Sequence, residues 1–223
     1  MNYGKQSLLA VLLALSGCHS DEYATPEETG EMPYGLWEFA FFTPKDLPAL
    51  VNYVGIIDDK KVVYSFRSLD SVDDSWATVG TWNNKVRRHA QFNKARHPPV
   101  TMLFCWDSII DKKTYETRIT FPESLRDQMS VSTGLDHYGE KAWNNTLLFG
   151  LAPGGKVRIW LQNSSGGNGS IPVEPKRITT VYGDKLEGCK GISNLDMSYE
   201  IPDGYDQNIK DFIKGKIYPY GEW

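Results

Sequence analysis

The chain has 223 residues, of which 28 are acidic, 24 are basic and four are histidine, and 13% are aromatic. The net charge of −4 leaves no basic surplus of the kind that nucleic-acid binding needs, so we expect no nucleic-acid partner. The aromatic content suits a dense core and also an interaction surface, because Tyr and Trp are enriched at interface hot spots.

The N-terminus carries a short apolar run, Leu8 to Leu15, preceded by Lys5. A membrane-spanning helix needs about 20 apolar residues, so this run matches the apolar region of a secretory signal instead. It ends in Leu-Ser-Gly-Cys, which resembles the lipobox of bacterial lipoproteins. We therefore expect residues 1–17 to be a signal peptide that is removed, and Cys18 to be acylated as a membrane anchor. The alternative is an ordinary signal peptide in which Cys18 is incidental.

The stretch after the cysteine indicates a tether and a location. His19 stands where an Asp tends to retain lipoproteins of Gram-negative bacteria at the inner membrane, so by analogy we expect the outer membrane, facing the periplasm. Residues 18–35 contain five acidic residues, prolines and no Lys or Arg, which is typical of a disordered, self-repelling linker. Residues 36–223 are then expected to form a single folded domain, although their length would also suffice for two small ones. Removing one lysine with the signal and five acids with the tether leaves 23 residues of each sign in that domain.

Two cysteines, Cys105 and Cys189, remain in the folded part. The periplasm is oxidising, so we expect them to pair. The long loop that such a bridge closes corresponds to about 4–5 kcal/mol of stabilisation in the chain-entropy estimate. Their positions in the sequence do not show whether they lie close together, so two free thiols are the alternative.

The pattern along the chain predicts a mainly β domain. Three hairpins are expected, with turns at Asp58–Lys60, Asp111–Lys113 and Pro153–Gly155 between strand-forming arms. The arm Thr114–Phe121 alternates, with Tyr115, Thr117, Ile119 and Phe121 on a buried face and Glu116, Arg118 and Thr120 on a wet face. The expected strands are Trp37–Thr43, Leu50–Ile57, Lys61–Phe66, Thr101–Ile110, Thr114–Phe121, Thr146–Leu151, Lys156–Leu161 and Ile178–Tyr182.

Helices are expected only at Pro122–Met129, with Pro122 as the first helical residue, and at Tyr205–Lys216, ending near Gly215. Successive hairpins with so little helix predict an antiparallel β-sandwich or a partly open barrel built of hairpins, with one or two short helices.

No set of residues matches a catalytic or metal-binding template. The stretch Ser164–Ser170 follows a strand without a helix to receive a nucleophile turn, so we expect a flexible loop. His89 and His97 lie in Arg87–Pro99, which is expected to be a solvated loop, and His137 is expected in a surface turn. The pairs Asp58–Asp59 and Asp73–Asp74 are expected to be solubilising edges, because adjacent side chains point apart. We therefore expect no enzyme activity, no catalytic residue, no metal and no cofactor.

Several stretches resemble a family of bacterial lipoproteins, common in enterobacteria, that is known only as a domain of unknown function. They are Trp37–Pro48, Phe66–Asp70, Cys105–Phe121, Leu148–Trp160 and Tyr218–Trp223. The most distinctive are LAPGG-x-V-x-x-W and the final PYGEW.

Some members of this family look like immunity lipoproteins that accompany type VI secretion phospholipase effectors. The resemblance implies a binding module whose partner is a cognate lipase effector, with a membrane contact through the anchor. The alternatives are a structural or housekeeping envelope lipoprotein that binds a glycan or lipid, and an enzyme. Loops that could contact a partner are Val72–Val79, Arg87–Pro99 and Asn163–Ser170.

Overall fold

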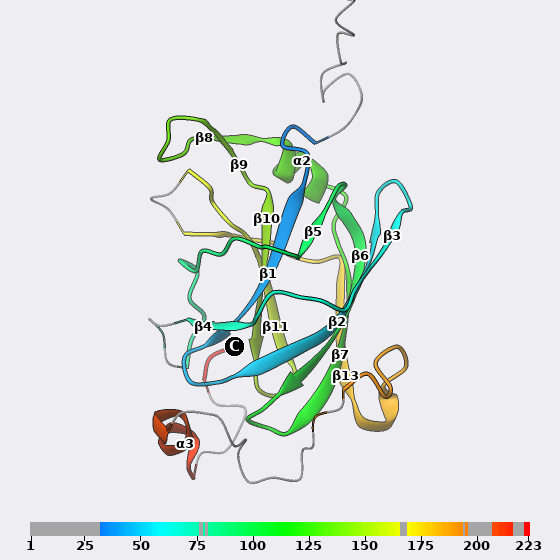
Figure 1. Ribbon diagram of the computed structural model, residues 1–223, viewed down its shortest axis with the longest axis vertical. Coiled ribbons are helices and arrows are strands. Elements are labelled where there is room, and N and C mark those ends of the chain that lie inside the picture. The colour runs from blue at the N-terminus through cyan, green and yellow to red at the C-terminus, as the bar shows by residue number, and fades with distance from the viewer. Residues whose placement is uncertain are drawn as a thin grey trace, which may run out of the picture.

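The computed structural model describes residues 32–75, 78, 80–165, 169–193, 195, 207–215 and 221–223. In this part of the chain two β-sheets face each other, and a small hairpin and a short helix close one end (Figure 1). The predicted β-sandwich is therefore confirmed. The expected signal peptide, the lipidation at Cys18 and most of the expected tether lie outside the described residues.

Sheet A has strand order β12-β11-β10-β1-β4, and β5 also pairs with β1. Its centre is mixed rather than wholly antiparallel, because β1 runs parallel to both β10 and β4. The ladder between β1 and β10 joins Phe39 to Leu147 and Phe41 to Phe149. The strands are β1 (Trp37–Pro44), β4 (Asp73–Ser75), β5 (Lys94–Ala95), β10 (Thr146–Ala152), β11 (Lys156–Leu161) and β12 (Ile171–Pro172).

Sheet B is antiparallel throughout, in the order β13-β7-β6-β2-β3. Its strands are β2 (Ala49–Asp58), β3 (Val63–Phe66), β6 (Pro99–Ser108), β7 (Lys113–Thr120) and β13 (Arg177–Tyr182). The 3₁₀ turn η1 (Gly183–Lys185) follows β13 directly. A separate two-stranded hairpin consists of β8 (Ser132–Leu135) and β9 (Lys141–Trp143).

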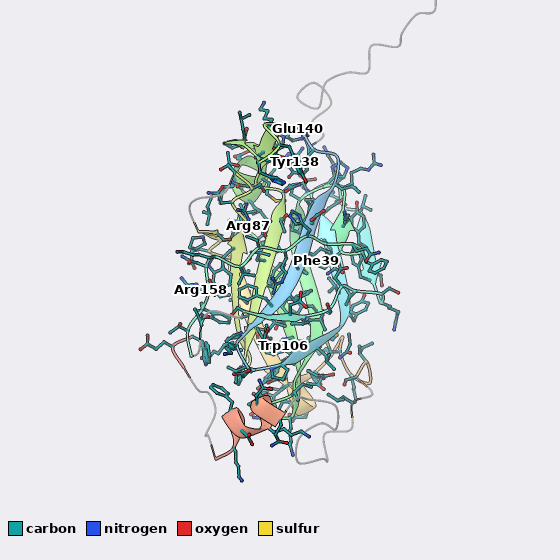
Figure 2. All side chains as sticks on the ribbon, turned by 60° about the vertical axis from the view of Figure 1, so that its left-hand side comes forward. Phe39, Arg87, Trp106, Tyr138, Glu140 and Arg158 are labelled. Atoms are coloured by element: carbon teal, nitrogen blue, oxygen red, sulfur yellow. A yellow bond between two sulfur atoms is a disulfide. The ribbon has the colours of Figure 1, made fainter. Side chains whose placement is uncertain are left out.

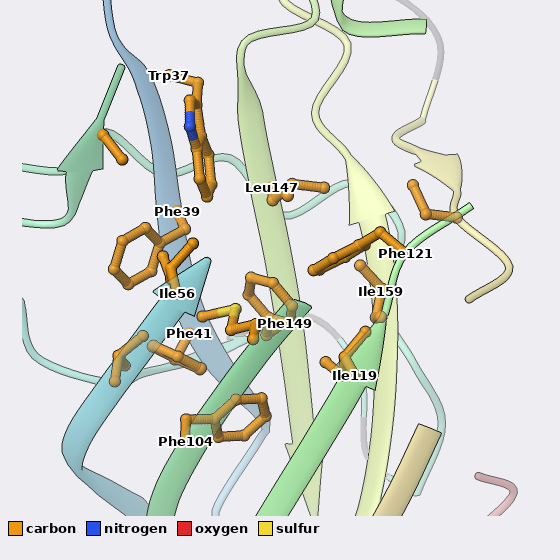
Figure 3. Packing of buried hydrophobic residues seen from close by; sticks show 14 of the residues in the cluster. Trp37, Phe39, Phe41, Ile56, Phe104, Ile119, Phe121, Leu147, Phe149 and Ile159 are labelled. Carbon is orange, nitrogen blue, oxygen red and sulfur yellow. The ribbon is translucent and has the colours of Figure 1, made fainter. Parts of the chain in front are cut away.

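The core lies between the two sheets and is dominated by aromatic rings (Figure 3). Phe41 from β1, Phe104 from β6 and Phe149 from β10 contact one another with ring centroids 5.1 to 5.8 Å apart. On β7, Tyr115 and Ile119 face this core as predicted. Such aromatic contacts add about 0.5–1.5 kcal/mol per pair beyond the area that they bury.

The outer face of sheet A is also covered. Trp82 and Val86, from the segment that precedes β5, pack on Phe42 of β1 and on Leu148 and Trp160 of the neighbouring strands. Strand β10 is consequently buried along its whole length. A strand buried on both faces needs a continuous apolar run rather than alternation, which is what this part of the sequence contains.

The three predicted hairpins are confirmed as the pairs β2–β3, β6–β7 and β10–β11. In the first turn the Asp58 carboxylate accepts hydrogen bonds from the backbone N–H groups of Lys60 (2.9 Å) and Val62 (2.8 Å). Asp58 is 1% exposed, and its neighbour Asp59 is paired with Arg126. The expectation that these two acids form a solubilising edge is therefore wrong: one shapes the turn and the other is bound to a helix.

The helices are short. Helix α2 (Leu125–Ser130) begins three residues later than predicted, because Pro122 lies in a preceding turn whose carbonyl accepts the N–H of Leu125 (3.0 Å). Helix α3 (Gln207–Ile213) falls within the second predicted helix, and Gly215 has the positive φ (+72°) expected just past a helix end. No helix in the described part of the chain is both long and apolar enough to cross a membrane.

The segment Arg87–Pro99 is not the solvated loop that was expected. Asn93 is fully buried and His97 is 7% exposed. Of the two histidines in this segment, His89 lies on the surface. The Asp70 carboxylate accepts hydrogen bonds from the backbone N–H groups of residues 91, 92 and 93 at 3.0 to 3.2 Å. The Trp37 indole N–H donates to the His97 carbonyl (2.6 Å). The segment is therefore held by Asp70 and by Trp37 of β1.

Candidate binding groove

A groove of about 820 Å³ lies on the outer face of sheet B. Residues that are neighbours across the strands form rows on this face. The middle row runs through all five strands, as Thr179, Arg118, Leu103, Gly55 and Ser65. We call this surface the sheet B groove. Its volume is in the range of ligand-binding clefts, but it is open along the sheet rather than enclosed.

Gly55 deepens the centre of the groove, because a strand position without a side chain leaves space between the side chains of the neighbouring residues. The Tyr53 ring occupies part of this space: a Cβ on Gly55 would lie 3.1 Å from the Tyr53 hydroxyl oxygen. The Arg67 guanidinium lies over the same ring, 5.6 Å from its centroid. Tyr53 is therefore held on the groove floor between a glycine and a cation.

One wall of the groove is the segment 183–192, which follows β13. Cys189 in this segment forms a disulfide with Cys105 of β6, and their Cα atoms are 5.4 Å apart. A Cβ on Gly188 would approach the Leu103 side chain to 3.1 Å, so the segment lies directly on the sheet. The predicted pairing of Cys105 and Cys189 is thus present in the structure, and it places a wall beside a sheet face that would otherwise be flat.

Glu116 of β7 fastens the same wall electrostatically. Its carboxylate accepts the backbone N–H groups of Glu187 and Cys189, each at 2.9 Å, and the Arg118 Nε at 2.6 Å. Arg118 also donates to the Glu187 carboxylate at 2.7 Å. Burial acts to raise the pKa of Glu116, but the two backbone donors and the guanidinium outweigh it, so the pKa lies below its ordinary value. Glu116 was expected on a wet face; it is buried because the disulfide brings the segment 183–192 over it.

The groove is cationic overall. Among the described residues, its lining contains Arg67, Arg118, Arg177 and Lys185 but only two carboxylates, and Arg118 pairs with both of them. The pKa of Arg118 is raised, first by its hydrogen bond to Glu116. Exposed positive charge therefore remains at the rim, where it can attract an acidic surface.

Apolar side chains accompany these charges. Ile57 and Val63 lie opposite each other on β2 and β3 and are 44% and 71% exposed. The lining residues also include hydroxyl groups, such as those of Ser65 and Thr101, and the part of the lining that the structure describes contains no histidine or aspartate. An apolar patch rimmed by cations is suited to bind a surface that has an apolar centre and acidic surroundings.

The three loops predicted to meet a partner do come together, but not at the groove. Arg88 from the second loop contacts Asp73 (3.3 Å) from the first, and Arg87 donates to the carbonyl of Asn163 in the third (2.5 Å). They lie beside sheet A, on the other side of the sandwich; residues 76, 77, 79 and 166–168 of these loops are outside the described ranges. The sequence did not predict the groove because its residues lie in strands, whereas the predicted partner surface consisted of loops. The available signal was Gly55 in β2, since a glycine inside a strand often marks a place where another group approaches closely.

His137 lies in the turn between β8 and β9, as expected, where the Asp136 carboxylate accepts the backbone N–H groups of Tyr138 (2.8 Å) and Glu140 (2.9 Å). Among the described residues no three His, Cys, Asp or Glu side chains are arranged so that they could hold a metal ion.

The two most distinctive sequence stretches meet on the outer face of sheet A. Trp160, which ends the first, and Trp223, which ends the second, both contact the Trp82 ring, at centroid distances of 5.6 and 5.5 Å. A Cβ on Gly150 would lie 2.6 Å from the Trp82 ring and 2.9 Å from the Trp160 ring. These residues are therefore needed for packing, which explains their pattern without a catalytic role.

The fold and the groove define a β-sandwich domain with one open, disulfide-walled face. The chain belongs to the family described as "Protein of unknown function (DUF2931)", whose model matches residues 22–221. No curated protein matches the chain, and no solved structure does either.

Proposed function

We propose that this protein is a membrane-anchored periplasmic lipoprotein that acts as an immunity protein: it binds a lipase or phospholipase effector delivered by type VI secretion and blocks it. The observation that carries this proposal is the sheet B groove, a fixed concave surface with exposed apolar side chains and surplus positive charge. The binding surface for the effector is this groove rather than the three loops beside sheet A.

The construction of the groove supports a preformed binding surface. The disulfide, the Glu116 carboxylate and the Arg118 guanidinium all fix the same wall. A surface that is rigid before binding loses less conformational entropy on association, which favours tight binding. The surface that the groove offers is smaller than a complete protein interface, which buries about 1,600 Å² in total. The groove residues therefore form the centre of the contact, and residues on the neighbouring strands form its rim.

The N-terminal sequence supports a position at the membrane. A lipase attacks phospholipids, so an inhibitor is most effective when it is held where the substrate lies. Acylation of Cys18 provides that, and the acidic linker keeps the domain at a high local concentration near the bilayer. The sorting analogy at His19 favours the outer membrane, with the domain in the periplasm. Replacing Cys18 by Ser should move the protein from the membrane fraction to the soluble periplasm.

The test is a competition between bacteria. A strain that lacks this gene is co-cultured with a parent strain that carries an active lipase effector, and separately with one whose effector is inactive. We expect loss of survival only against the active effector. Complementation with Val63→Glu, which places a charge in the groove, should fail to restore survival, whereas Ile171→Glu, at an exposed position (41%) on the edge strand β12, should restore it.

Equal survival against both attackers would overturn the proposal, and the housekeeping role of an envelope lipoprotein that binds a glycan or lipid would replace it. Normal protection by the Val63→Glu variant at wild-type protein levels would instead show that the effector binds elsewhere on the domain.

A further inference from the structure

One end of the domain carries four exposed apolar side chains. Leu36, Val131, Leu135 and Tyr138 are 46%, 58%, 63% and 79% exposed. They belong to the hairpin β8–β9, its turn, and the segments next to it. We call this region the hairpin end; Figure 2 shows Tyr138 and Glu140 at its tip, far from Trp106 at the opposite part of the sandwich.

The hairpin end is fixed in shape, so these side chains are held outward. The Asp136 carboxylate closes the turn by accepting the Tyr138 and Glu140 backbone N–H groups. Trp143 of β9 packs against Tyr34, with ring centroids 6.3 Å apart. An apolar tip that does not fold back on its own domain leaves its side chains available to another surface.

The chain enters the described domain at this same end. Met32, the first described residue, is 2% exposed, and the hydroxyl group of Ser130 at the end of α2 donates to its sulfur (3.7 Å). Only 13 residues separate it from Cys18. A chain of that length reaches at most about 45 Å when fully extended. A lipid on Cys18 would therefore keep this end of the domain nearest the bilayer.

We propose that the hairpin end rests on the lipid bilayer, with Leu135 and Tyr138 among the headgroups. This inference depends on the proposed lipid anchor but not on the identity of the effector. Tyr and Trp are enriched at the membrane interface, where an apolar ring and a polar group are both satisfied. Lys141, whose ammonium group is 4.6 Å from the Trp143 ring, can extend its charge toward the headgroups.

The charges of this end favour a zwitterionic surface. Asp136 and Glu140 outnumber Lys141 around the tip, so no cationic patch is present in the hairpin to draw anionic lipid. Contact then depends on apolar burial, which is weak by itself and becomes effective because the anchor makes it intramolecular. No residue of the hairpin end lines the sheet B groove. The strands of sheet B lie on the right-hand side of Figure 1, whereas β8 and β9 lie at the upper left. The bilayer and the effector can therefore be bound together.

The experiment uses the full lipidated protein in phosphatidylcholine vesicles. An environment-sensitive dye is attached through Leu135→Cys, and in a matched control through Val63→Cys, which is more exposed (71%) but lies in the groove. We expect the emission of the dye at position 135 to shift to the blue and the emission at position 63 to stay unchanged. Adding Tyr138→Asp to the labelled Leu135→Cys protein should remove the shift, and phosphatidylglycerol should not increase it.

Vesicle flotation separates the possible failures. If the protein floats with the vesicles and the dye at position 135 stays as in water, the anchor holds and the bilayer contact is wrong. If the protein does not float, both the anchor and the contact fail. A shift that requires anionic lipid, or that appears only on addition of an effector protein, would also overturn the proposed apolar contact with a bilayer.

Discussion

Removing the disulfide between Cys105 and Cys189 should destabilise the domain by several kcal/mol. The bridge links residues 84 positions apart. In the chain-entropy model, closing a loop of this size restricts the unfolded chain by about 4–5 kcal/mol at 25 °C. Both cysteines are buried, at 0% and 1% exposure. Alanine is therefore the suitable replacement at both positions, since it introduces no polar group that lacks a partner.

The assay is reversible urea or thermal unfolding of the wild-type protein and of the Cys105→Ala, Cys189→Ala double variant. For a domain of this size 1 kcal/mol corresponds to roughly 2–4 °C in Tm, so we expect Tm to fall by about 8–20 °C. Wild-type protein unfolded in the presence of a reductant is the control, because it lacks the bridge and keeps both sulfur atoms. It should show nearly the same loss.

A loss of less than about 1 kcal/mol in the double variant would refute this reasoning. That result would mean that the segment 183–192 is held on the sheet by Glu116 and Arg118 alone. It would also mean that the unfolded chain without the bridge is already as restricted as the bridged one. A large loss in the variant without a similar loss in the reduced wild type would assign the effect to packing of the sulfur atoms.

Two further substitutions test the groove wall and the outer layer of sheet A. Because the pKa of Glu116 is lowered in the folded state, its ionised form adds stability above the unfolded pKa, and this stability is lost as the pH falls through the folded pKa. Glu116→Gln should therefore cost about 2–3 kcal/mol at pH 7 and less in acid; an equal cost at both pH values, measured by urea unfolding, would contradict this. Gly150→Ala should cost about 1–3 kcal/mol because its Cβ would overlap two tryptophan rings; unchanged stability and tryptophan fluorescence would show that these rings can move aside.

The hairpins could be predicted because their signals are local. Asp58 and the residues after it form a turn through contacts within four positions. The arm that contains Tyr115 and Ile119 alternates cleanly because one of its faces meets the core. The parallel pairing of β1 with β10 has no such local signal, since Phe39 and Leu147 are neighbours in sheet A but lie far apart in the sequence. The continuous apolar runs in both strands do indicate burial on two faces, but not which strand is the neighbour.

The groove could be predicted only in part. The pairing of Cys105 and Cys189 followed from the expected compartment, but the wall that it makes did not, because the position of segment 183–192 depends on contacts between distant residues. The same holds for Asp70, whose partners lie about twenty positions later and convert an apparently solvated segment into a fixed one. Glycine at position 55 is a local signal for a hollow in a sheet, and it is informative once the face that it occupies is known.

Strand β1 is the first strand to be made during synthesis, yet it occupies an interior position in sheet A, between β10 and β4. Its long ladder pairs Glu38 to Phe42 with residues 146–150, so this ladder cannot form until most of the chain exists. Folding that waits for such distant contacts is slow, and the run from Phe39 to Phe42, which is almost entirely buried in the finished domain, stays accessible in the meantime. An exposed apolar strand of this kind associates readily with other chains. The newly made protein is therefore expected to depend on a folding helper that holds this strand until β10 has been made.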